Sequence, residues 1–581
     1  MAKKSLIARY IPMSRWAPHY TRANLMDDSV AALIVAIMLI PQSLGLALVA
    51  GLPPETGLYA SIFGLAVYSV FGTSNTLSVA PVAVISLMTA AALAKLPIED
   101  PAEILNAAFV LALLSGIGLF FLGLFRLGFM ANFLSYPVIS AFVTASALII
   151  GMSQLKHLFG IESEGHNLIG LGLSLLESIH QTNLIALGLG IVSIGFILWC
   201  KARMEWLLVK IGLPSYFAKV VSRTGPVFIV IASSLVAYIW RLDLYGLQLL
   251  GEIPSGIPKF KAPLIDAELF SSLIGSAALI AIIGFVESIS VAQTMAAKRR
   301  ERIDLDQELV GLGSANIVTS FFGGFPVSGG FSRSVVNFDA GAATPASGLI
   351  VAILVTVVAS FFTPLLFWLP KVSLAAIILV AVIPLVDFSM LRKSWQYSKA
   401  DFTAVFFTLT LTLLMGVEFG IAAGVLASVL IHLYKTSKPH VAVVGRVAGS
   451  EHFRNVKRHN VETFENLLSI RIDESLYFAN TRYLEELIFK LVSRQPKVEH
   501  VILMFTAVNA VDMSALETLT KINDTLSELG ISLHLSEVKG PIMDRLQPTD
   551  FIKYLSGNCY LSQNRAVEAL KDTEMPLSSL Q

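Results

Sequence analysis

The stretch Gly323-Gly-Phe-Pro-Val-Ser-Gly-Gly-Phe-Ser-Arg333-Ser-Val-Val-Asn337 decides how this chain must fold. It interrupts a region in which segments 282–286, 318–322 and 349–362 have the composition of membrane spans. The four glycines and Pro326 of the stretch cannot sustain a helix, so we expect the chain to unwind there. Unwound backbone at membrane depth survives only when it is surrounded by protein or borders a water-filled cavity.

The residues that follow this break predict an anion site. A new helix is expected to begin at Ser332-Arg333-Ser334, and a helix N-terminus presents free N–H groups and a partial positive charge. Arg333 adds a full positive charge between long apolar stretches. Close helix packing would explain one glycine, and snorkelling would explain one arginine. The combination favours the anion site, because charges inside membranes are functional by default.

The composition is that of a membrane protein. The chain has 581 residues, of which 55% are hydrophobic and 14% are charged, whereas soluble proteins carry about 25% charged residues. The net charge of +1 favours neither a nucleic acid nor an acidic partner. Cys200 and Cys559 are far apart in the sequence and predict neither a disulfide framework nor a zinc site.

We expect three parts: a cytoplasmic leader at 1–28, a transmembrane transport domain at 29–436 and a cytoplasmic α/β domain at 437–581. The leader is basic, with Lys3, Lys4 and Arg9, and lacks the apolar core and cleavage site of a signal peptide. The predicted apolar spans lie at Ser29–Ala50, Gly57–Phe71, Leu77–Met88, Ala102–Leu124, Phe129–Ser153, Leu184–Cys200, Pro226–Trp240, Leu269–Met295, Leu309–Phe322, the Arg333 segment, Thr344–Trp368, Leu374–Leu385, Phe402–Met415 and Phe419–Tyr434.

This pattern predicts about fourteen transmembrane segments when the two short ones count as half-spans. The short segments, Leu77–Met88 and the one that contains Arg333, stand at roughly the third and tenth positions, as a seven-plus-seven inverted repeat requires. Pro81 is expected in the first turn of the earlier half-helix. Basic clusters follow even-numbered spans, which places them, the N-terminus and the C-terminal domain on the cytoplasmic side.

Glu287 is the second charged residue of interest, because the segment 281–293 around it is otherwise apolar or weakly polar. Burial disfavours the charged form of a carboxylate, so Glu287 could carry a proton between the two sides of the membrane. The alternative is a structural glutamate that is hydrogen-bonded to a neighbouring helix.

The chain changes its pattern after about His440. Short strands are expected at Leu468–Arg471, Ser475–Phe478, Val501–Phe505 and Ile531–Leu535. Leucines at helical spacing lie between them, with Asp512 as a helix cap and Gly530 as a helix end. Alternating strands and helices predict a small α/β domain.

Several motifs, in this order and spacing, resemble the sulfate permease (SulP) family of anion transporters, which carry a C-terminal STAS domain. The motifs are Leu39-Ile-Pro-Gln-Ser43, Ala50-Gly-Leu-Pro-Pro-Glu-Thr-Gly-Leu-Tyr59, Phe71-Gly-Thr-Ser74, Gln307-Glu-Leu-Val-Gly-Leu-Gly313 with Asn316, and the Gly323–Asn337 stretch. The resemblance covers nearly the whole chain. It implies a polytopic α-helical membrane fold similar to uracil permease, with seven-plus-seven inverted repeats, a moving core domain and a fixed gate domain.

The resemblance also implies a substrate site between the third and tenth half-helices. The residues expected to form it are Gln42, Leu46, Ala80, Val82, Ala83, Gly330, Phe331, Ser332 and Arg333. Leu46 replaces an aromatic residue and Ala80 replaces a glycine that many members show, so the identity of the anion stays open.

Coupling and regulation are further implications of the resemblance. Glu287 stands where related proton-coupled sulfate carriers have a carboxylate. Sodium-coupled bicarbonate members pair an aspartate there with a hydroxyl four residues on, where this chain has Val291. The pattern Asp512-Met-Ser514-Ala resembles the loop that is phosphorylated in anti-anti-sigma proteins, which makes Ser514 a candidate phosphorylation site, although a serine at a helix start is more often a cap.

The leading hypothesis is therefore a secondary active transporter in the plasma (inner) membrane, most consistent with proton-coupled sulfate uptake by elevator-like alternating access. The alternatives are an exchanger of bicarbonate, chloride or dicarboxylate, a passive anion channel, and a membrane anchor for a signalling STAS module. No nucleotide-binding loop, catalytic triad or metal cluster is visible, so neither an enzyme nor a cofactor or metal is expected. The expected partners are an inorganic anion, protons, the lipid bilayer and, from the resemblance, a second copy of the chain.

Overall fold

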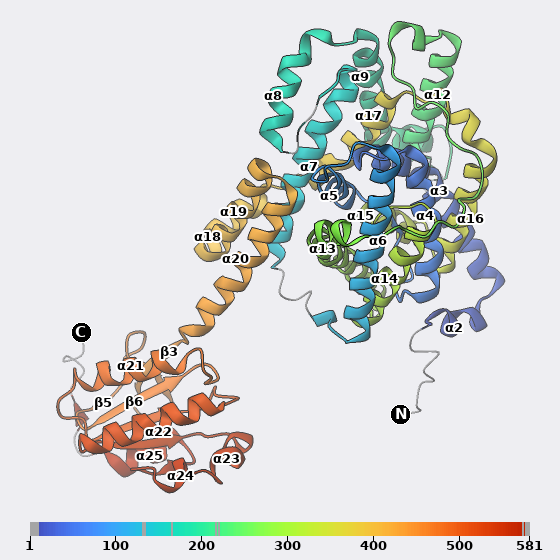
Figure 1. Ribbon diagram of the computed structural model, residues 1–581. Coiled ribbons are helices and arrows are strands. Elements are labelled where there is room, and N and C mark those ends of the chain that lie inside the picture. The colour runs from blue at the N-terminus through green and yellow to red at the C-terminus, as the bar shows by residue number, and fades with distance from the viewer. Residues whose placement is uncertain are drawn as a thin grey trace. The chain divides into compact units, whose positions relative to one another are not determined.

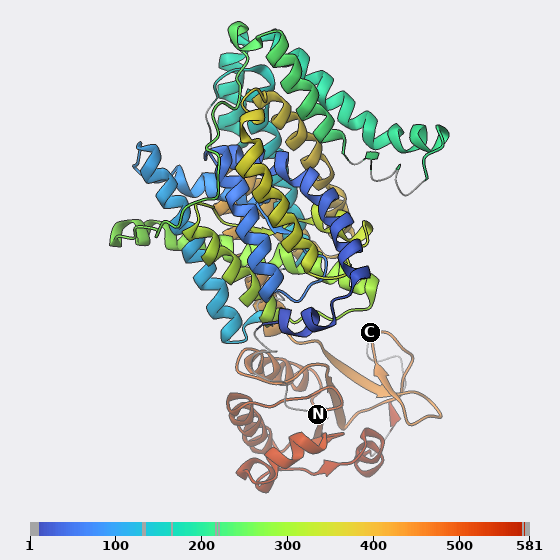
Figure 2. The ribbon, with the colours of Figure 1, turned by 90° about the vertical axis from the view of Figure 1, so that its right-hand side faces the viewer.

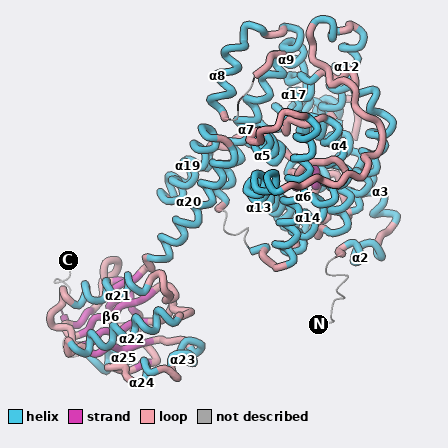
Figure 3. The backbone as a smooth tube through the Cα atoms, viewed as in Figure 1, coloured by secondary structure: helices cyan, strands magenta, loops and turns pink. Residues whose placement is uncertain are grey.

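The computed structural model describes residues 11–129, 135–163, 165, 167–214, 218, 221–222, 224–571 and 574–575. Lys3, Lys4 and Arg9 of the predicted leader lie outside the described residues. The chain divides into two compact units, Met1–Ser428 and Val429–Gln581. Figure 3 shows that the first unit consists almost entirely of helices, whereas the strands of the second unit form a sheet.

The helices of the first unit follow the apolar segments of the sequence (Figure 1). They are α3 (Arg22–Val49), α4 (Pro54–Phe71), α5 (Ala83–Leu93), α6 (Pro101–Leu124), α7 (Tyr136–Phe159), α8 (Leu168–Ser178), α9 (Leu184–Trp199), α10 (Glu205–Lys210), α12 (Gly225–Ile239), α13 (Ala267–Arg299), α14 (Leu305–Phe321), α15 (Phe331–Asp339), α16 (Ala346–Val357), α17 (Lys371–Val382), α18 (Ser389–Tyr397) and α19 (Lys399–Met415). The helix α20 (Val417–Ser437) ends the series, after the short α2 (Met13–Trp16) began it.

Eight helices within the described ranges are long and apolar enough to cross a membrane. Two shorter apolar helices, α5 and α12, add to them. Helix α14 packs against α6 and α4, and α16 packs against α3 and α4. Figure 2 shows α3 and α16, in blue and yellow, side by side. A second group of packed helices consists of α7, α9, α17 and α19.

Polar side chains cap the starts of several long helices. The side chains of Thr21, Asp100, Asp266 and Asp304 accept hydrogen bonds from backbone N–H groups in the first turns of α3, α6, α13 and α14. Because Thr21 is the cap of α3, this helix begins before the predicted start of the first span, and Asp28 lies inside the helix. The helix α7 runs from Tyr136 to Phe159, later than predicted, because a proline occupies its first turn.

Two very short strands pair with each other where the sequence predicts that the helices are interrupted. The strands β1 (Val79–Ala80) and β2 (Ser328–Gly329) are antiparallel, with Val79 opposite Gly329 and Ala80 opposite Ser328. The expected break within Gly323–Asn337 is confirmed, and α15 begins directly after it. Pro81 does not lie in the first turn of a helix as predicted, because pairing through Ala80 keeps the chain extended until α5 begins at Ala83.

Glu308 of α14 fixes the loop that leads into β1. Its carboxylate accepts hydrogen bonds from the N–H of Thr73 (2.7 Å), the hydroxyl of Thr73 (2.6 Å), the N–H of Ser74 (3.2 Å) and the hydroxyl of Tyr68 (2.7 Å). Glu308 is fully buried. The carboxylate therefore accepts hydrogen bonds from backbone N–H groups of this loop that have no partner in a helix or a sheet.

Asp28 of α3 does the same for the loop after α15. Its carboxylate accepts from the N–H groups of Ala343 (2.7 Å) and Thr344 (3.0 Å), and from the hydroxyls of Thr344 (2.6 Å) and Tyr20 (3.1 Å). Asp28 is also fully buried. The two carboxylates thus meet the same kinds of donor: two consecutive N–H groups, a threonine hydroxyl and a tyrosine hydroxyl.

The second unit is an α/β domain with a six-stranded sheet in the order β4-β3-β6-β7-β8-β9. The pairs from β6 to β9 are parallel, whereas β3 is antiparallel to both of its neighbours. The strands are β3 (Val441–Arg446), β4 (Phe453–Asn455), β5 (Thr463–Phe464), β6 (Leu467–Ile472), β7 (His500–Met504), β8 (Ser532–Ser536), β9 (Cys559–Tyr560) and β10 (Glu574–Met575). The helices are α21 (Thr481–Val492), α22 (Met513–Glu528), α23 (Gly540–Leu546), α24 (Asp550–Lys553) and α25 (Gln563–Leu570).

The apolar core of this unit lies on both faces of the sheet, with α21, α22, α23 and α24 on one face and α25 on the other. The predicted strand Ser475–Phe478 is absent; only Leu476 forms an isolated bridge, to Val511, because the chain turns there, with the Asn480 side chain accepting from the N–H of Tyr477. Asp512 caps α22 as predicted, accepting from the N–H of Ala515 (2.8 Å).

Replacing Glu308 with glutamine tests the role of its carboxylate. The glutamine NH₂ group cannot accept a hydrogen bond, so at least one buried donor of Tyr68, Thr73 or Ser74 loses its partner. We expect the free energy of unfolding to fall by about 2–4 kcal/mol, measured by thermal and denaturant unfolding of the purified protein.

The matched control is Glu301→Gln. Glu301 is exposed and accepts one hydrogen bond, from Asn75 at 3.1 Å, so its replacement should cost less than about 0.5 kcal/mol. Equal stability of the Glu308→Gln variant and the wild type would contradict this account of Glu308.

Candidate functional site

The N-termini of α5 and α15 form the centre of the candidate site. The helix α5 follows β1, and α15 follows β2, so the pairing of the two strands brings both helix starts together. Their N-cap residues are Val82 and Gly330, and neither helix has a side-chain cap. Free N–H groups at two neighbouring helix ends favour a negatively charged ligand.

Arg333 adds a buried positive charge in the first turn of α15. Its side chain is only 4% exposed, and its Nε and Nη2 atoms have no hydrogen-bond partner. The guanidinium lies against the backbone of Gly330, where an added Cβ would stand 2.7 Å from Nη2. Buried guanidinium groups are normally paired, so these two nitrogens are available to an anion.

Side chains from neighbouring helices clamp the two crossing strands. Asn316 of α14 accepts from the N–H of Val327 (2.8 Å) and donates to its carbonyl oxygen (3.0 Å). The Ser334 hydroxyl accepts from the N–H of Ser78 (3.0 Å) and donates to the carbonyl oxygen of Gly330 (2.7 Å). Asn337 donates to the carbonyl oxygen of Thr76 (3.2 Å) and to the Ser347 hydroxyl (3.0 Å).

Ser288 of α13 is a further clamp, because its hydroxyl accepts from the N–H of Gly329 at 2.8 Å. Asn316, Ser334 and Asn337 stand in the sequence motifs, but the sequence predicted no hydrogen-bonding role for them or for Ser288. The signal that could have found them is the unwound segment itself, whose backbone donors and acceptors require side-chain partners.

The other predicted site residues differ in exposure. Gln42 of α3 is half-buried. Leu46 packs in an apolar cluster that Ala83 joins, so α3 contacts the start of α5. Ala80, Val82 and Gly330 are buried, Ala83 is half-buried, and Phe331 and Ser332 are exposed. The structure therefore gathers Ala80, Val82, Ala83, Gly330, Phe331, Ser332 and Arg333 at the two helix starts.

Glu287 borders a small cavity that is otherwise lined by apolar side chains. The lining residues come from four helices, namely Val84 of α5, Ile139, Phe142 and Val143 of α7, Ile283 and Val286 of α13, and Ile421 of α20. The Oε2 atom of Glu287 is buried and has no hydrogen-bond partner. The expected alternative, a glutamate bonded to a neighbouring helix, finds no support at this oxygen. Glu287 and Arg333 interact electrostatically without forming an ion pair.

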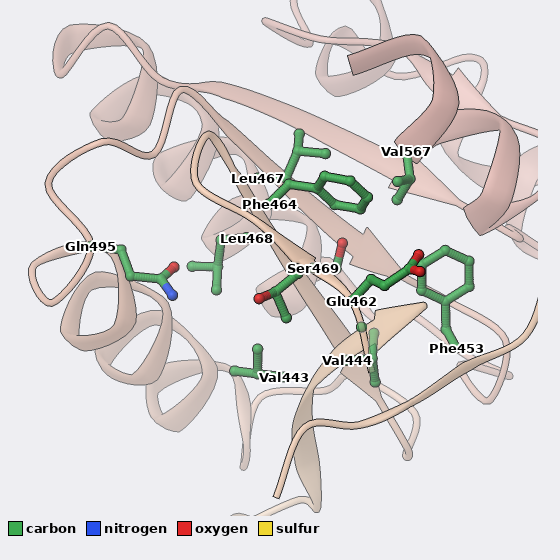
Figure 4. Close-up of a pocket in the computed structure, with 12 residues that line it drawn as sticks. Val443, Val444, Phe453, Glu462, Phe464, Leu467, Leu468, Ser469, Gln495 and Val567 are labelled. Atoms are coloured by element: carbon green, nitrogen blue, oxygen red, sulfur yellow. The ribbon is translucent and has the colours of Figure 1, made fainter. Parts of the chain in front are cut away.

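A second small cavity lies in the C-terminal unit (Figure 4). Its polar lining comes from Glu462, Thr463, Ser469 and Gln495, and apolar side chains such as Phe453 and Phe464 surround the rest. The one ionisable group is Glu462, a carboxylate that already pairs with Arg446 at 2.8 Å. This cavity therefore lacks the positive charge that an anion requires.

Two further groups in the C-terminal unit bear on chemistry. Ser514 is exposed in the first turn of α22, and its phosphorylation stays a prediction. The Nδ1 atom of His534 accepts from the N–H of Asn558 at 3.0 Å, and its Nε2 lies 3.2 Å from Nδ1 of His500. Burial, and then the neighbouring His500, lowers the pKa of His534 to about 4. This histidine is therefore neutral at physiological pH.

Metal binding finds no support within the described ranges, where no group of three or more His, Cys, Asp or Glu side chains could hold an ion. The arrangement offers two helix N-termini and one guanidinium to an anion, with a carboxyl group nearby.

Comparison with known proteins places these features in a family. The model of the sulfate permease family matches residues 25–408, and the STAS domain model matches residues 458–566. The probable sulfate transporter 4.2 of Arabidopsis thaliana is 36% identical over 524 residues, which are 88% of this chain and 75% of that protein. The chloroplastic sulfate transporter 4.1 of the same plant is 33% identical over 546 residues, 91% of this chain and 76% of that protein.

Solved structures show the same fold. The murine Solute Carrier 26 family member A9 anion transporter, in its inward-facing state, has a TM-score of 0.88 at 23% identity, over 98% of this chain and 95% of its own. The transmembrane domain of a cyanobacterial bicarbonate transporter, BicA, has a TM-score of 0.60 at 23% identity, over 70% of this chain and 98% of its own. At this level of identity the likeness concerns the fold alone.

Replacing Gly330 with alanine tests the contact between Gly330 and the Arg333 guanidinium. The backbone of Gly330 has a φ of −87°, which alanine tolerates, so the added Cβ should displace only the guanidinium. We expect the affinity for sulfate, measured by isothermal titration calorimetry, to fall about tenfold, which is about 1.4 kcal/mol.

The matched control is Gly275→Ala on α13, where an added Cβ meets no atom within 4 Å. Both variants should unfold at nearly the wild-type temperature. Unchanged sulfate binding by the Gly330→Ala variant would contradict the placement of the anion beside Arg333.

Proposed function

This chain belongs to the sulfate permease family, and we propose that it is a secondary active transporter that carries sulfate across the membrane together with protons. The observation that carries the proposal is Arg333, a buried guanidinium with unpartnered Nε and Nη2 atoms at the uncapped start of α15. The uncapped start of α5 lies at the same crossing. The site therefore offers one full charge and two partial charges to an oxyanion.

Sulfate is the proposed substrate because relatives at 26–36% identity are named sulfate transporters. A tetrahedral dianion can accept N–H donors from two helix starts and from a guanidinium at once. We propose that Phe331 and Ser332, which are exposed beside Arg333, form the open side of the pocket, with Gln42 and Leu46 of α3 next to them.

Glu287 supports proton coupling. Its Oε2 atom is buried without a partner, and its charge interacts with that of Arg333. A proton on Glu287 would remove a negative charge close to the anion, and therefore favour binding of a dianion. Entry of a dianion against a membrane potential of 100 mV costs about 4.6 kcal/mol, and co-transported protons offset this cost. Val291, which has no hydroxyl, argues against a sodium ion.

The proposed mechanism is alternating access, in which a core moves against a gate. The cavity at Glu287 is lined by side chains from α5 and α13 and from α7 and α20. These would be core and gate helices, respectively, within a fold of about fourteen segments in two inverted repeats. Displacement of α5 and α13 along α7 and α20 would carry both the anion and Glu287.

Topology and assembly complete the proposal. The basic residues at the end of α13, Lys298 and Arg299, favour a cytoplasmic location for this end. We propose that the N-terminus and the STAS domain share that side of the plasma membrane, and that two copies of the chain form a dimer, as the family resemblance implies. Relatives are named as transporters, and an enzymatic activity is not part of the proposal.

Replacing Arg333 with alanine tests the anion site. Wild-type protein in proteoliposomes should accumulate radiolabelled sulfate when an inward proton gradient is imposed. Uptake by the Arg333→Ala variant should be at least tenfold lower than that of the wild type, because a hydrogen bond to a charged group contributes about 1.5–3 kcal/mol to binding. Arg302→Ala, in the exposed loop that follows α13, is the control and should retain uptake.

Two outcomes would count against the proposal. Full uptake by the Arg333→Ala variant would remove the anion site from α15. Absence of sulfate uptake by folded wild-type protein would discard sulfate, and bicarbonate, chloride and dicarboxylates would be assayed next in the same vesicles.

Replacing Glu287 with glutamine tests the proton coupling. Glutamine resembles the protonated carboxyl group at every pH, so external acidification should no longer stimulate uptake, whereas downhill sulfate movement should persist. The measurement is initial sulfate uptake at external pH 6 and 8, with Glu268→Gln at the exposed start of α13 as the control. Wild-type pH dependence in the Glu287→Gln variant would show that this carboxyl group is not the proton carrier.

A further inference from the structure

The residue after Glu287 connects the two charged centres of the proposed site. Ser288 is fully buried, and its hydroxyl accepts from the N–H of Gly329 in β2 at 2.8 Å. The same hydroxyl lies 2.6 Å from the carbonyl oxygen of Gly284 and 2.9 Å from the hydroxyl of Ser328. Through Ser288, α13 is thus hydrogen-bonded to β2, the strand that precedes α15.

The hydroxyl protons of this cluster have two arrangements. Ser288 can donate to the Gly284 carbonyl while Ser328 donates to Ser288, or Ser288 can donate to Ser328 while Ser328 donates to the Gly284 carbonyl at 2.8 Å. In both arrangements the Ser288 oxygen still accepts from Gly329. The contact between α13 and β2 is therefore kept whichever arrangement is present.

The path from Glu287 to Arg333 through this contact is short. Glu287 and Ser288 are adjacent in α13, and Gly329 precedes Gly330, the N-cap of α15. The Arg333 guanidinium lies against Gly330. One hydrogen bond and a few covalent bonds thus join the carboxyl group to the residue that positions the guanidinium.

We infer that Ser288 is a positioning residue that couples the protonation state of Glu287 to the geometry of the anion site at Arg333. This inference rests on the proposed function for its physiological meaning. A shift of α13 at Glu287 moves the Ser288 hydroxyl, which moves the Gly329–Gly330 backbone and the start of α15. The Glu287 side chain borders the cavity, while Ser288 contacts β2, so one helix links the two.

The primary test requires no substrate. Hydrogen exchange of the backbone amides in the segment 327–334 is measured by mass spectrometry on the full-length protein at one pH. Glu287→Gln stands for the protonated carboxyl group. In the wild-type background we expect this substitution to change the exchange rate of the segment at least threefold. In the Ser288→Ala background the same substitution should change the rate less than 1.5-fold, because the link to Gly329 is gone.

Ser290→Ala is the matched control. Ser290 lies two residues further along α13, and its exposed hydroxyl donates only to its own helix, to the carbonyl oxygen of Val286 at 2.7 Å. In this background the effect of Glu287→Gln should equal the wild-type effect. Should Ser288→Ala fail to fold, Ser288→Cys, which replaces the hydroxyl with a weaker acceptor of similar size, takes its place and should reduce the effect at least twofold.

A second readout connects the contact to transport. The sulfate KM of the wild type should fall when the pH falls from 8 to 6, and this dependence should shrink to less than half in the Ser288→Ala variant while persisting in Ser290→Ala. The Ser288→Thr variant, which retains a hydroxyl, should show the pH dependence of the wild-type sulfate KM.

The outcomes separate the two proposals. An equal effect of Glu287→Gln on hydrogen exchange in the wild-type and Ser288→Ala backgrounds would overturn the role of Ser288, whatever the transport data show. Loss of the effect in Ser288→Ala, combined with no sulfate uptake by the wild type, would support the link and overturn the proposed substrate.

Discussion

Unpaired backbone cannot remain unsatisfied inside a membrane, and the strand crossing of this chain is organised around that constraint. The strands β1 and β2 pair through only two residues each, so most polar groups around them need other partners. Side chains of the surrounding helices α14, α13 and α15 supply these partners: Asn316 at Val327, Ser288 at Gly329 and Ser334 at Ser78. The N–H groups at the starts of α5 and α15 are the exception, since no side chain caps them. The donors that the fold leaves open are those that an anion can use.

Buried charges in the first unit fall into two groups with opposite surroundings. The carboxylates of Glu308 and Asp28 each accept four hydrogen bonds and hold the loops that flank the half-helices. Glu287 and Arg333, in contrast, have buried polar atoms without partners. A charge whose hydrogen bonds are all satisfied stabilises one arrangement, whereas an unsatisfied one responds to a ligand or a proton. The first pair therefore keeps the scaffold in place, and we propose that the second pair responds to the anion and the proton.

The sequence predicted the effects of glycine and proline residues better than the hydrogen bonds of serine residues. Glycines and Pro326 require an unwound backbone, so the break and the helix start at Arg333 followed from local chemistry. Strands of two residues have no periodicity, so the register of β1 and β2 could not be predicted. The hydrogen bond from Gly329 to Ser288 could not be predicted, because a serine inside a membrane helix commonly bonds to its own helix, as Ser290 does. Glu308 lies in the motif Gln307–Gly313, but its hydrogen-bond partners in the loop are more than two hundred residues away in the sequence, so only the structure identifies them.

The central claim is that the anion lies between the starts of α5 and α15, beside Arg333. The most direct measurement is a structure of the protein with bound selenate, a sulfate analogue whose selenium can be located by anomalous diffraction. This account predicts one selenium position within hydrogen-bonding reach of the Arg333 guanidinium and of the backbone N–H groups at both helix starts. A selenium position elsewhere in the molecule, with the space at Arg333 empty at saturating selenate, would contradict it.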